Sequence, residues 1–551
     1  MNSVSHRFAR RSLLQAAGAA GLVAGALPSA AKARIPGRPA ALRGRWGDQG
    51  NGRFVNPIIP ADYSDIDVIR TEDGYYAISS TLHTAPGMAI LHSHDLVNWT
   101  QIGHAVPDIS RLDPTLGWLD MQAYGRGVWA GAIRRHNSLY YIYFTCPDSG
   151  LYVTTASAPA GPWSAPACLL ATKGFDDPCP FWDDDGQAWL VATRFAPDPV
   201  TGAEYEIFLY RLSADGLSLD TGSAVKIHQS AGSEANKLYK FDGLYYHYFS
   251  EVKPEGRVAM MKRASSLKGP WQSQQLNHVD GTIDKEPNQG GLVTDADGKW
   301  WFLTHQGRGD WEGRALCLLP VTWRNGWPVV GQVGADGVGI MVWESGMPGG
   351  RSSPRLPHLS DDFSEGRLSD VWEWNHQPQP GMWRIEAGRG LRLFAASPAR
   401  PGFDGVRNVL SQRSWRTAHS AVKVELDLSD MADGQVAGLC HFAERHAFIG
   451  VRQSAGKRQL VFSTEDKWVD GPSVSRSTLW LHSWWDIDGR ARFSFSVDGD
   501  AEVPFGFAYQ LDWGHYRGDR TGVFTYNAME DGSVLFRDFR YAIAPQNQGA
   551  P

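Results

Sequence analysis

Five short runs of aromatic and β-branched residues, each placed directly after a pair of turn residues, recur along the first part of the chain. Asp-Gly and Asn-Ser pairs supply the positive φ angles of a tight hairpin, and the runs that follow have the composition of a strand. Each phrase therefore predicts a β-hairpin. The phrases are Asp73-Gly74-Tyr75-Tyr76, Asn137-Ser138-Leu139-Tyr140, Asp185-Gly186-Gln187-Ala188, Asp242-Gly243-Leu244-Tyr245 and Asp297-Gly298-Lys299-Trp300.

A second phrase follows three of the hairpins and indicates the outer edge of the same unit: Asp95-Leu96-Val97-Asn98-Trp99, Ala160-Gly161-Pro162-Trp163 and Lys268-Gly269-Pro270-Trp271. Five units of roughly 50 to 60 residues, each with about four strands, are typical of a five-bladed β-propeller, in which radial repetition leaves only short edges. A sandwich with coincidental hairpins is the competing interpretation. We expect the propeller over residues 50–345.

The pattern changes after this region. Residues 346–359 are rich in Gly, Pro and Ser and show no periodicity, which predicts a linker. Beyond them, runs such as residues 421–428 and 492–497 alternate between apolar and polar positions. This alternation predicts an antiparallel β-sandwich over residues 360–545. The predicted fold class is therefore all-β, a five-bladed β-propeller followed by a β-sandwich.

The N-terminus has the features of an export signal. Arg10-Arg11-Ser12-Leu13-Leu14 is a twin-arginine pattern, and an apolar stretch and the small-residue site Ala31-Lys32-Ala33 follow it. We expect residues 1–33 to be a removable twin-arginine signal peptide, so that the mature protein is periplasmic or extracellular. An ordinary apolar N-terminal helix is the alternative.

Composition narrows the class of partner. The 551 residues include 53 basic and 59 acidic side chains, giving a net charge of -6, and no basic block appears after residue 33. Nucleic acid is therefore not an expected partner, and no later segment is apolar enough over about 18 residues to span a membrane. The five cysteines are scattered without CxxC spacing, which argues against a zinc site and a disulfide framework.

Three acidic residues stand near the start of strand-like runs in three different units of the repeat: Asp65, Asp177 and Glu234. In a propeller such positions converge at one end of the central axis. Hydrolysis of a glycosidic bond needs this kind of convergence, because one carboxylic acid protonates the leaving oxygen and one carboxylate activates water or attacks directly. A solvated turn carboxylate is the ordinary alternative for each residue taken alone.

Several motifs around these residues resemble glycoside hydrolase family 43, and the resemblance covers nearly the whole mature chain. They are Ala61-Asp62-Tyr63-Ser64-Asp65-Ile66-Asp67-Val68-Ile69-Arg70, Gly127-Val128-Trp129-Ala130, Phe181-Trp182-Asp183-Asp184-Asp185-Gly186, Asn288-Gln289-Gly290-Gly291 and Leu318-Leu319-Pro320-Val321-Thr322-Trp323. The sequence departs from the common family wording at Ser64 and Ile66, where prolines are frequent, and at Ala235-Asn236, where glycine is usual. These changes put substrate preference more in doubt than activity.

The resemblance implies a role for each carboxylate. Asp65 falls on the general base, Asp177 on the aspartate that positions the acid and raises its pKa, and Glu234 on the general acid. Family members invert configuration, which requires room for water between the base and the sugar. Asp176 competes for the role of Asp177, and Asp62 and Asp67 compete for that of Asp65.

The same resemblance places Trp129, Gln289 and Arg314 at substrate-binding positions, where a core tryptophan, a turn amide and a surface charge are the alternatives. It implies that no cofactor is required. His305 resembles a histidine near the propeller axis that in relatives can face a bound cation, often calcium, through water. A buried, hydrogen-bonded histidine without an ion is the competing interpretation, because calcium prefers oxygen ligands.

The C-terminal region resembles the concanavalin-like (jelly-roll) sandwich of many β-xylosidases and α-L-arabinofuranosidases, and one of its loops can close over the active site in relatives. We therefore expect an exo-acting, inverting glycoside hydrolase that releases xylose or arabinose from oligosaccharides derived from xylan or arabinan. A non-catalytic carbohydrate-binding protein and a propeller glycosidase with a different sugar specificity are the alternatives.

Overall fold

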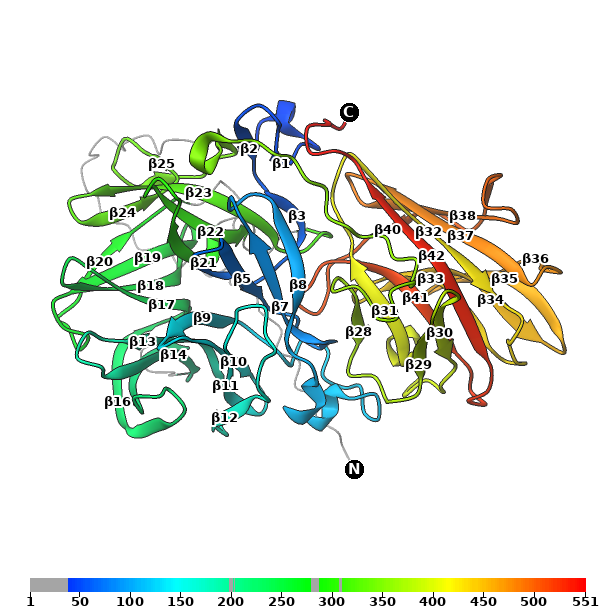
Figure 1. The fold of residues 1–551 in the computed structure, drawn as a ribbon, viewed down its shortest axis with the longest axis horizontal. Coiled ribbons are helices and arrows are strands. Elements are labelled where there is room, and N and C mark those ends of the chain that lie inside the picture. Colours follow the sequence, from blue (N-terminus) through cyan, green and yellow to red (C-terminus); the bar gives the residue numbers. More distant parts are fainter. Residues whose placement is uncertain (1–37, 198–201, 203, 279–286, 307–309) are drawn as a thin grey trace, which may run out of the picture. The chain divides into compact units, whose positions relative to one another are not determined.

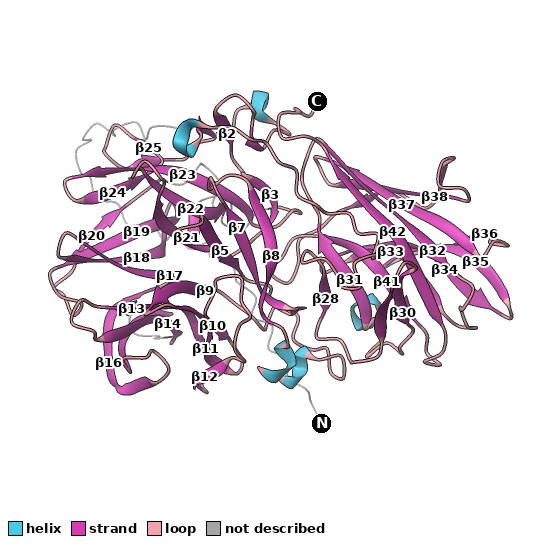
Figure 2. Cartoon of the chain, viewed as in Figure 1, coloured by secondary structure: helices cyan, strands magenta, loops and turns pink. Residues whose placement is uncertain are grey.

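The computed structural model of the protein describes residues 38–197, 202, 204–278, 287–306 and 310–551. The predicted signal peptide, residues 1–33, lies outside the described residues. Strands dominate the described part of the chain, as Figure 2 shows. The helices in it are single 3-10 turns: η1 (Ala40–Leu42), η2 (Ile109–Arg111), η3 (Pro114–Leu116), η4 (Pro348–Gly350) and η5 (Phe403–Gly405).

Five consecutive antiparallel sheets form the first region, and each contains four strands in sequence order (Figure 1). Blade 1 contains β4 (Asp67–Arg70), β5 (Tyr75–Ser79), β7 (Gly87–Ser93) and β8 (Trp99–Val106). Blade 2 contains β9 (Gly131–His136), β10 (Leu139–Cys146), β11 (Gly150–Ala156) and β12 (Ala167–Leu170). Blade 3 contains β13 (Phe175–Trp182), β14 (Ala188–Phe195), β15 (Tyr205–Leu212) and β16 (Leu219–Ser230). Blade 4 contains β17 (Ser233–Phe241), β18 (Leu244–Lys253), β19 (Gly256–Ala264) and β20 (Gln272–Gln275).

Blade 5 contains β21 (Pro287–Thr294), β22 (Trp300–Gln306), β23 (Ala315–Arg324) and β24 (Trp327–Val330), and β3 (Ile59–Asp62) also pairs with β23. The first strands of the five blades contact one another in a closed ring, β4 to β9, β13, β17, β21 and back to β4. This ring is the wall of a central axis, and the predicted five-bladed propeller is confirmed. Each predicted hairpin phrase lies at the turn between the first and second strands of its blade.

Two further sheets form the predicted sandwich. The first contains, in spatial order, β36 (Trp468–Ser473), β35 (Lys457–Thr464), β34 (His446–Ser454), β33 (Val436–Phe442), β41 (Arg520–Tyr526), β31 (Asn408–Arg413), β28 (Glu373–Asn375) and β6 (Thr84–Ala85). The second contains β29 (Trp383–Glu386), β30 (Gly390–Phe394), β42 (Ser533–Ile543), β32 (His419–Asp427), β37 (Thr478–Asp486), β38 (Arg490–Ser496) and β39 (Val503–Pro504), with β40 (Tyr509–Gln510) also on β38. Residues 351–360, inside or next to the predicted linker, belong to no helix or strand.

Small sheets complete the strand inventory. The strands β1 (Gly47–Asp48), β2 (Arg53–Val55) and β27 (Glu344–Gly346) pair with one another, so the two ends of the propeller region are joined. A further pair is formed by β25 (Gln332–Val333) and β26 (Gly339–Ile340).

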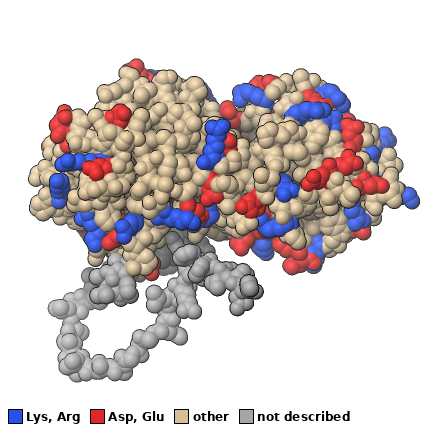
Figure 3. Space-filling view, turned by 90° about the horizontal axis from the view of Figure 1, so that it is seen from below, with Lys and Arg blue, Asp and Glu red and all other residues tan. Residues whose placement is uncertain are grey.

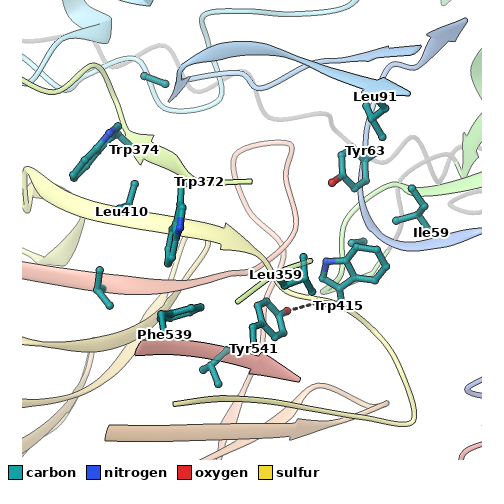
Figure 4. Packing of buried hydrophobic residues seen from close by; sticks show 14 of the residues in the cluster. Ile59, Tyr63, Leu91, Leu359, Trp372, Trp374, Leu410, Trp415, Phe539 and Tyr541 are labelled. Carbon is teal, nitrogen blue, oxygen red and sulfur yellow. Dashed lines mark hydrogen bonds between the residues drawn. The ribbon is translucent and has the colours of Figure 1, made fainter. Parts of the chain in front are cut away.

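The hydrophobic core continues from the propeller into the sandwich. One cluster of buried residues includes Ile59, Tyr63 and Leu91 of the propeller together with Trp372, Trp415 and Tyr541 of the sandwich (Figure 4). The Tyr541 hydroxyl accepts a hydrogen bond from the Trp415 backbone N–H at 3.0 Å. The two folds therefore share apolar packing, which stabilises their contact in proportion to the apolar area removed from water.

Basic and acidic side chains are interspersed on the face drawn in Figure 3, without a large region of either sign. No helix within the described ranges is long and apolar enough to cross a membrane.

Candidate active site

The three predicted carboxylates lie at the same end of the propeller axis. Asp65 lies two residues before the start of β4, Asp177 is the third residue of β13, and Glu234 is the second residue of β17. These strands are the first strands of blades 1, 3 and 4, and they neighbour one another around the ring through β9 and β21.

A β-bulge occurs at the same point in blades 3, 4 and 5. Three steps along the first strand face two steps along the second, between Asp176 and Cys179, between Glu234 and Lys237, and between Pro287 and Gly290. A bulge leaves an extra residue out of the ladder and changes the direction of its side chain. Asp177 and Gln289 both lie within such bulges, and the Gln289 Nε2 donates to Asp177 Oδ1 at 2.5 Å.

Asp176, Asp177 and Glu234 form a close cluster. One carboxylate oxygen from each residue lies within 4.8 Å of the other two. The Asp177 Oδ2 accepts a hydrogen bond from the Ala235 backbone N–H at 2.7 Å, which fixes the aspartate beside Glu234. Asp176 and Asp177 are buried, whereas the Glu234 side chain is 17% exposed. Glu234 is therefore the member of the cluster that a ligand can reach most directly.

Electrostatic repulsion and burial keep protons in this cluster. Burial and the neighbouring Glu234 charge raise the pKa of Asp177 to about 6, against the smaller opposing effect of Lys237. Burial, followed by the charges of Asp177 and Glu234, raises the pKa of Asp176 well above its usual value. Like charges this close cannot all ionise together near neutral pH. The cluster therefore retains at least one proton there and titrates as a unit.

Asp65 is held differently. Its Oδ1 accepts a hydrogen bond from the Arg314 guanidinium at 2.9 Å, and its side chain is 15% exposed. Among the described residues, no group of three close ligand atoms joins Asp65 to the cluster. One carboxylate thus faces the cluster from a separate position, oriented by an arginine.

Two of the three competing aspartates, Asp62 and Asp67, have partners outside the carboxylate cluster. The Asp62 Oδ1 accepts from the Arg314 backbone N–H at 2.9 Å, and Asp67 is fully buried and paired with Arg134 at 2.6 Å. Neither side chain belongs to the cluster. Asp176, in contrast, is a member of it, so the structure places both Asp176 and Asp177 beside Glu234.

The other predicted residues surround these carboxylates. The His305 Nδ1 accepts from the Asp65 backbone N–H at 3.4 Å, and its ring is fully buried. The Trp129 backbone N–H donates to the Thr145 carbonyl at 2.9 Å, and the Thr145 hydroxyl donates to Asp176 at 3.2 Å. Gln289 and Arg314 thus bond directly to the carboxylates of Asp177 and Asp65, His305 bonds to the Asp65 backbone, and Trp129 bonds to the backbone of Thr145, whose hydroxyl contacts Asp176.

Three contacts at this site involve residues that the sequence did not single out. The Arg257 Nη1 lies 3.3 Å from Glu234 Oε1. Two aromatic residues come from the sandwich: the Tyr516 ring is 6.0 Å from the Trp129 ring, and the Trp513 ring centroid is 5.7 Å from the Arg314 guanidinium carbon. The aromatic run around residues 513–516 was the only sequence signal for the loop, and it lies far from the carboxylates along the chain.

This arrangement is suited to acid and base catalysis at one bond. A proton is retained on a partly accessible carboxyl cluster, and a second carboxylate held by an arginine stands apart from it. Hydrolysis of a glycosidic bond requires such a pair, one protonated carboxylic acid and one separate carboxylate.

Comparisons with known proteins agree with this chemistry. The family model described as "Glycosyl hydrolases family 43" matches residues 54–328, and that of the "Beta xylosidase C-terminal Concanavalin A-like domain" matches residues 360–542. A β-xylosidase of Formosa agariphila is 32% identical over 550 residues, which cover 91% of this chain and 92% of that protein. The chain belongs to glycosyl hydrolases family 43.

Two more relatives extend the comparison for this family 43 glycoside hydrolase. A xylosidase/arabinosidase of Butyrivibrio fibrisolvens is 32% identical over 485 residues, covering 83% of this chain and 87% of that protein. The solved structure of a bifunctional GH43-CE protein of Bacteroides eggerthii matches with a TM-score of 0.78 and 26% identity. The match covers 91% of this family 43 chain and 64% of the longer solved chain.

Proposed function

We propose that this family 43 enzyme is an exo-acting, inverting glycoside hydrolase that releases terminal xylose or arabinose from oligosaccharides derived from xylan or arabinan. The observation that carries the proposal is the pairing of the proton-retaining Asp176, Asp177 and Glu234 cluster with a separate, arginine-held Asp65. The names of the relatives, a β-xylosidase and a xylosidase/arabinosidase, support the two pentoses.

Each carboxylate has a distinct role in this proposal. Glu234 is the general acid, because it is the most accessible member of the cluster and can deliver a proton to the leaving oxygen. Asp177 is a positioning residue, because its carboxylate accepts hydrogen bonds from the Ala235 backbone N–H, next to Glu234, and from the Gln289 side chain. Asp65 is the general base that activates water, and Arg314 orients its carboxylate.

The sandwich supports exo action. Tyr516 and Trp513 reach Trp129 and Arg314 from a domain that follows the propeller in the chain. Sandwich residues that close one side of the site favour a pocket that accepts the end of a glycan over an open groove that accepts its middle. The substrate partner is an oligosaccharide or polysaccharide, and the twin-arginine pattern at Arg10-Arg11 supports export to the periplasm or the extracellular space.

Replacement of the general acid tests the proposal. For Glu234→Gln we expect kcat/KM on unactivated xylo- or arabino-oligosaccharides to fall by about 10²- to 10⁴-fold, the usual contribution of a positioned acid. Aryl pentosides with strongly acidic leaving groups should lose much less, because they need no protonation. For the wild type, NMR of the first product formed should show the inverted anomer.

Glu255→Gln is the matched control, because Glu255 is an exposed glutamate of the same blade. This variant should retain wild-type activity. A carbohydrate-binding protein would instead be favoured if the wild type bound these glycosides without hydrolysing them. The same conclusion would follow if Glu234→Gln and the wild type did not differ on unactivated glycosides. A panel of aryl xylosides and aryl arabinofuranosides identifies the preferred pentose, and hydrolysis of hexosides alone would favour a different sugar specificity.

A further inference from the structure

Gly125 lies in the segment that leads to Trp129 and is contacted on three sides. Its backbone N–H donates to His83 Nδ1 at 3.1 Å, and its carbonyl accepts a hydrogen bond from Trp129 Nε1 at 2.9 Å. The position where a side chain would begin faces the sandwich hairpin at residues 514–517, because a Cβ there would lie 3.1 Å from the Tyr516 ring. One residue therefore joins a buried histidine, the predicted substrate-binding tryptophan and the sandwich.

This position requires glycine for two independent reasons. The φ angle of Gly125 is 69°, in the left-handed region that glycine adopts without a steric penalty. A Cβ contact of 3.1 Å is also shorter than the ordinary separation of about 3.5 to 4.0 Å between carbon atoms. Any side chain at residue 125 therefore pushes Tyr516 and its hairpin away from the propeller.

His83 is a fixed acceptor for the backbone N–H that it contacts. Its side chain is fully buried, and its ring centroid lies 4.6 Å from that of Tyr124 and 5.0 Å from that of His376. Burial, and after it the charge of Arg517, holds the pKa of His83 well below its usual value. The neutral ring keeps the lone pair on Nδ1 that the hydrogen bond needs.

A backbone bridge holds the two contacting segments in register. The Leu82 N–H donates to the Val128 carbonyl and the Val128 N–H donates to the Leu82 carbonyl, both at 2.9 Å. These residues directly precede His83 and Trp129 in the chain. The bridge fixes the backbone of both segments, so the contacts at Gly125 add the direction of the indole ring and the position of the hairpin.

We propose that Gly125 is the junction that fixes one wall of the sugar pocket, the wall formed by Trp129 and Tyr516. The proposal rests on the hydrolase function proposed above. His83 and Gly125 are positioning residues that act on sugar affinity through this wall. An aromatic wall contacts the sugar in the same way before and during bond cleavage, so its displacement raises KM and leaves kcat nearly unchanged.

The first test compares KM and kcat of His83 and Gly125 variants on xylo- or arabino-oligosaccharides. His83→Leu removes the acceptor, and KM should rise about 5- to 10-fold, the usual effect of losing one hydrogen bond, with kcat within about twofold of the wild type. His83→Asn places an amide oxygen where Nδ1 stood and should restore most of the affinity. Gly125→Ala displaces the hairpin from the other side and should raise KM in the same way.

His482→Leu is the matched control for the loss of a buried histidine. His482 lies on β37 of the sandwich, where its Nε2 is 3.0 Å from the Ser496 hydroxyl. This variant should lower the melting temperature and leave KM unchanged. A folded His83→Leu variant with the KM of the wild type overturns the proposal, and so does a rise in KM that His83→Asn fails to reverse. If His83→Leu does not fold, Gly125→Ala decides, because the KM of the wild type in that variant overturns the proposal.

The second test needs no activity and so separates this proposal from the proposed function. The protein is labelled with 5-fluorotryptophan, and the fluorine NMR resonance of Trp129 is identified by its absence from Trp129→Phe. We expect this resonance to move in His83→Leu and in Gly125→Ala, and to keep its wild-type position in His83→Asn and in His482→Leu. A resonance that moves in neither of the first two variants overturns the proposal. If the wild type hydrolyses no pentoside, the proposed function fails, and the spectra still decide whether Gly125 fixes the indole.

Discussion

Backbone conformation at single residues directs the active-site carboxylates. Asp65, Asp177 and Ala235 have φ angles of 56°, 49° and 70°. Left-handed conformations cost non-glycine residues roughly 1 kcal/mol or more, and they persist where the surrounding structure determines them. Here hydrogen bonds do so, since the Asp177 carboxylate accepts the Ala235 N–H and the Asp65 N–H donates to His305. Local strain is thus concentrated at the residues to which we assign the chemistry.

The raised pKa of Asp177 has a consequence for stability. Folding raises this pKa from its ordinary value to about 6, so the folded state prefers the protonated carboxyl. This preference contributes fully below about pH 4 and is lost as the pH rises through about 6. At pH 8 the ionised Asp177 therefore destabilises the fold by up to about 3 kcal/mol, since one pKa unit corresponds to about 1.4 kcal/mol.

Asp177→Asn should remove this cost. The Gln289 side chain can present its unpartnered Oε1 to the new amide, while the amide oxygen still accepts the Ala235 N–H. We expect the variant to be inactive on unactivated glycosides. At pH 8 its free energy of unfolding should exceed that of the wild type by roughly 1 to 3 kcal/mol, and its melting temperature should be higher. The difference should vanish toward pH 4. A variant less stable than the wild type at pH 8 would show that the carboxylate hydrogen bonds outweigh repulsion.

At the scale of elements, the strands were more predictable than their irregularities. The hairpin phrases combine turn residues with β-formers, and short-range chemistry alone fixes such turns. The bulges in blades 3, 4 and 5 have no shared signal, because the residues they displace are Asp177-Pro178, Ala235-Asn236 and Asn288-Gln289. The strand register at these bulges is therefore known only from the structure. The same holds for the contact between Gln289 and Asp177, because the sequence placed Gln289 only at a substrate-binding position.

A second element that the sequence could not reveal is the hairpin at residues 514–517. Backbone hydrogen bonds join Gly514 and Arg517 in both directions, and His515 and Tyr516 between them have φ angles of 54° and 64°. Two-residue turns of this kind usually contain Asn or Gly. The strained turn presents the Tyr516 side chain, which is 43% exposed, next to Trp129.

Tyr516→Ala tests whether this hairpin forms part of the substrate pocket. We expect kcat/KM on xylo- or arabino-oligosaccharides to fall about 5- to 10-fold, corresponding to the ~1 kcal/mol of a well-placed aromatic contact. Tyr516→Phe should retain most of the activity. Phe507→Ala is the control, because Phe507 is an aromatic residue of the sandwich with 51% exposure. Unchanged kinetics for Tyr516→Ala would place the hairpin outside the pocket.

At the scale of the whole molecule, a buried ion-pair network joins the propeller to the sandwich. Glu373 on β28 is fully buried. Its Oε1 accepts a hydrogen bond from Arg413, and its Oε2 accepts one from Thr84 and pairs with Arg520 at 2.7 Å. Arg413 also donates to the Asp62 carbonyl at 2.5 Å, three residues before Asp65. The sandwich therefore supports the segment that carries the proposed base. Nothing in the sequence linked the propeller residues to the sandwich residues, because Thr84 and Glu373 lie 289 positions apart and Asp62 and Arg413 lie 351 positions apart.

Loss of Glu373 should therefore affect both stability and catalysis. Burial alone would raise the pKa of Glu373, but Arg413 and Arg520 outweigh burial and hold it well below the usual value, so the group is ionised at neutral pH. Glu373→Gln leaves two buried arginines without their counter-charge, and removal of one partner from such a network costs about 3 to 5 kcal/mol. We expect a lower melting temperature and, below it, reduced kcat because the Asp62 to Asp65 segment loses its support. Glu344→Gln breaks the exposed pair with Arg53 and should cost less than about 1 kcal/mol. If Glu373→Gln has the melting temperature of Glu344→Gln and keeps full kcat, the propeller positions the proposed base, Asp65, without help from the sandwich.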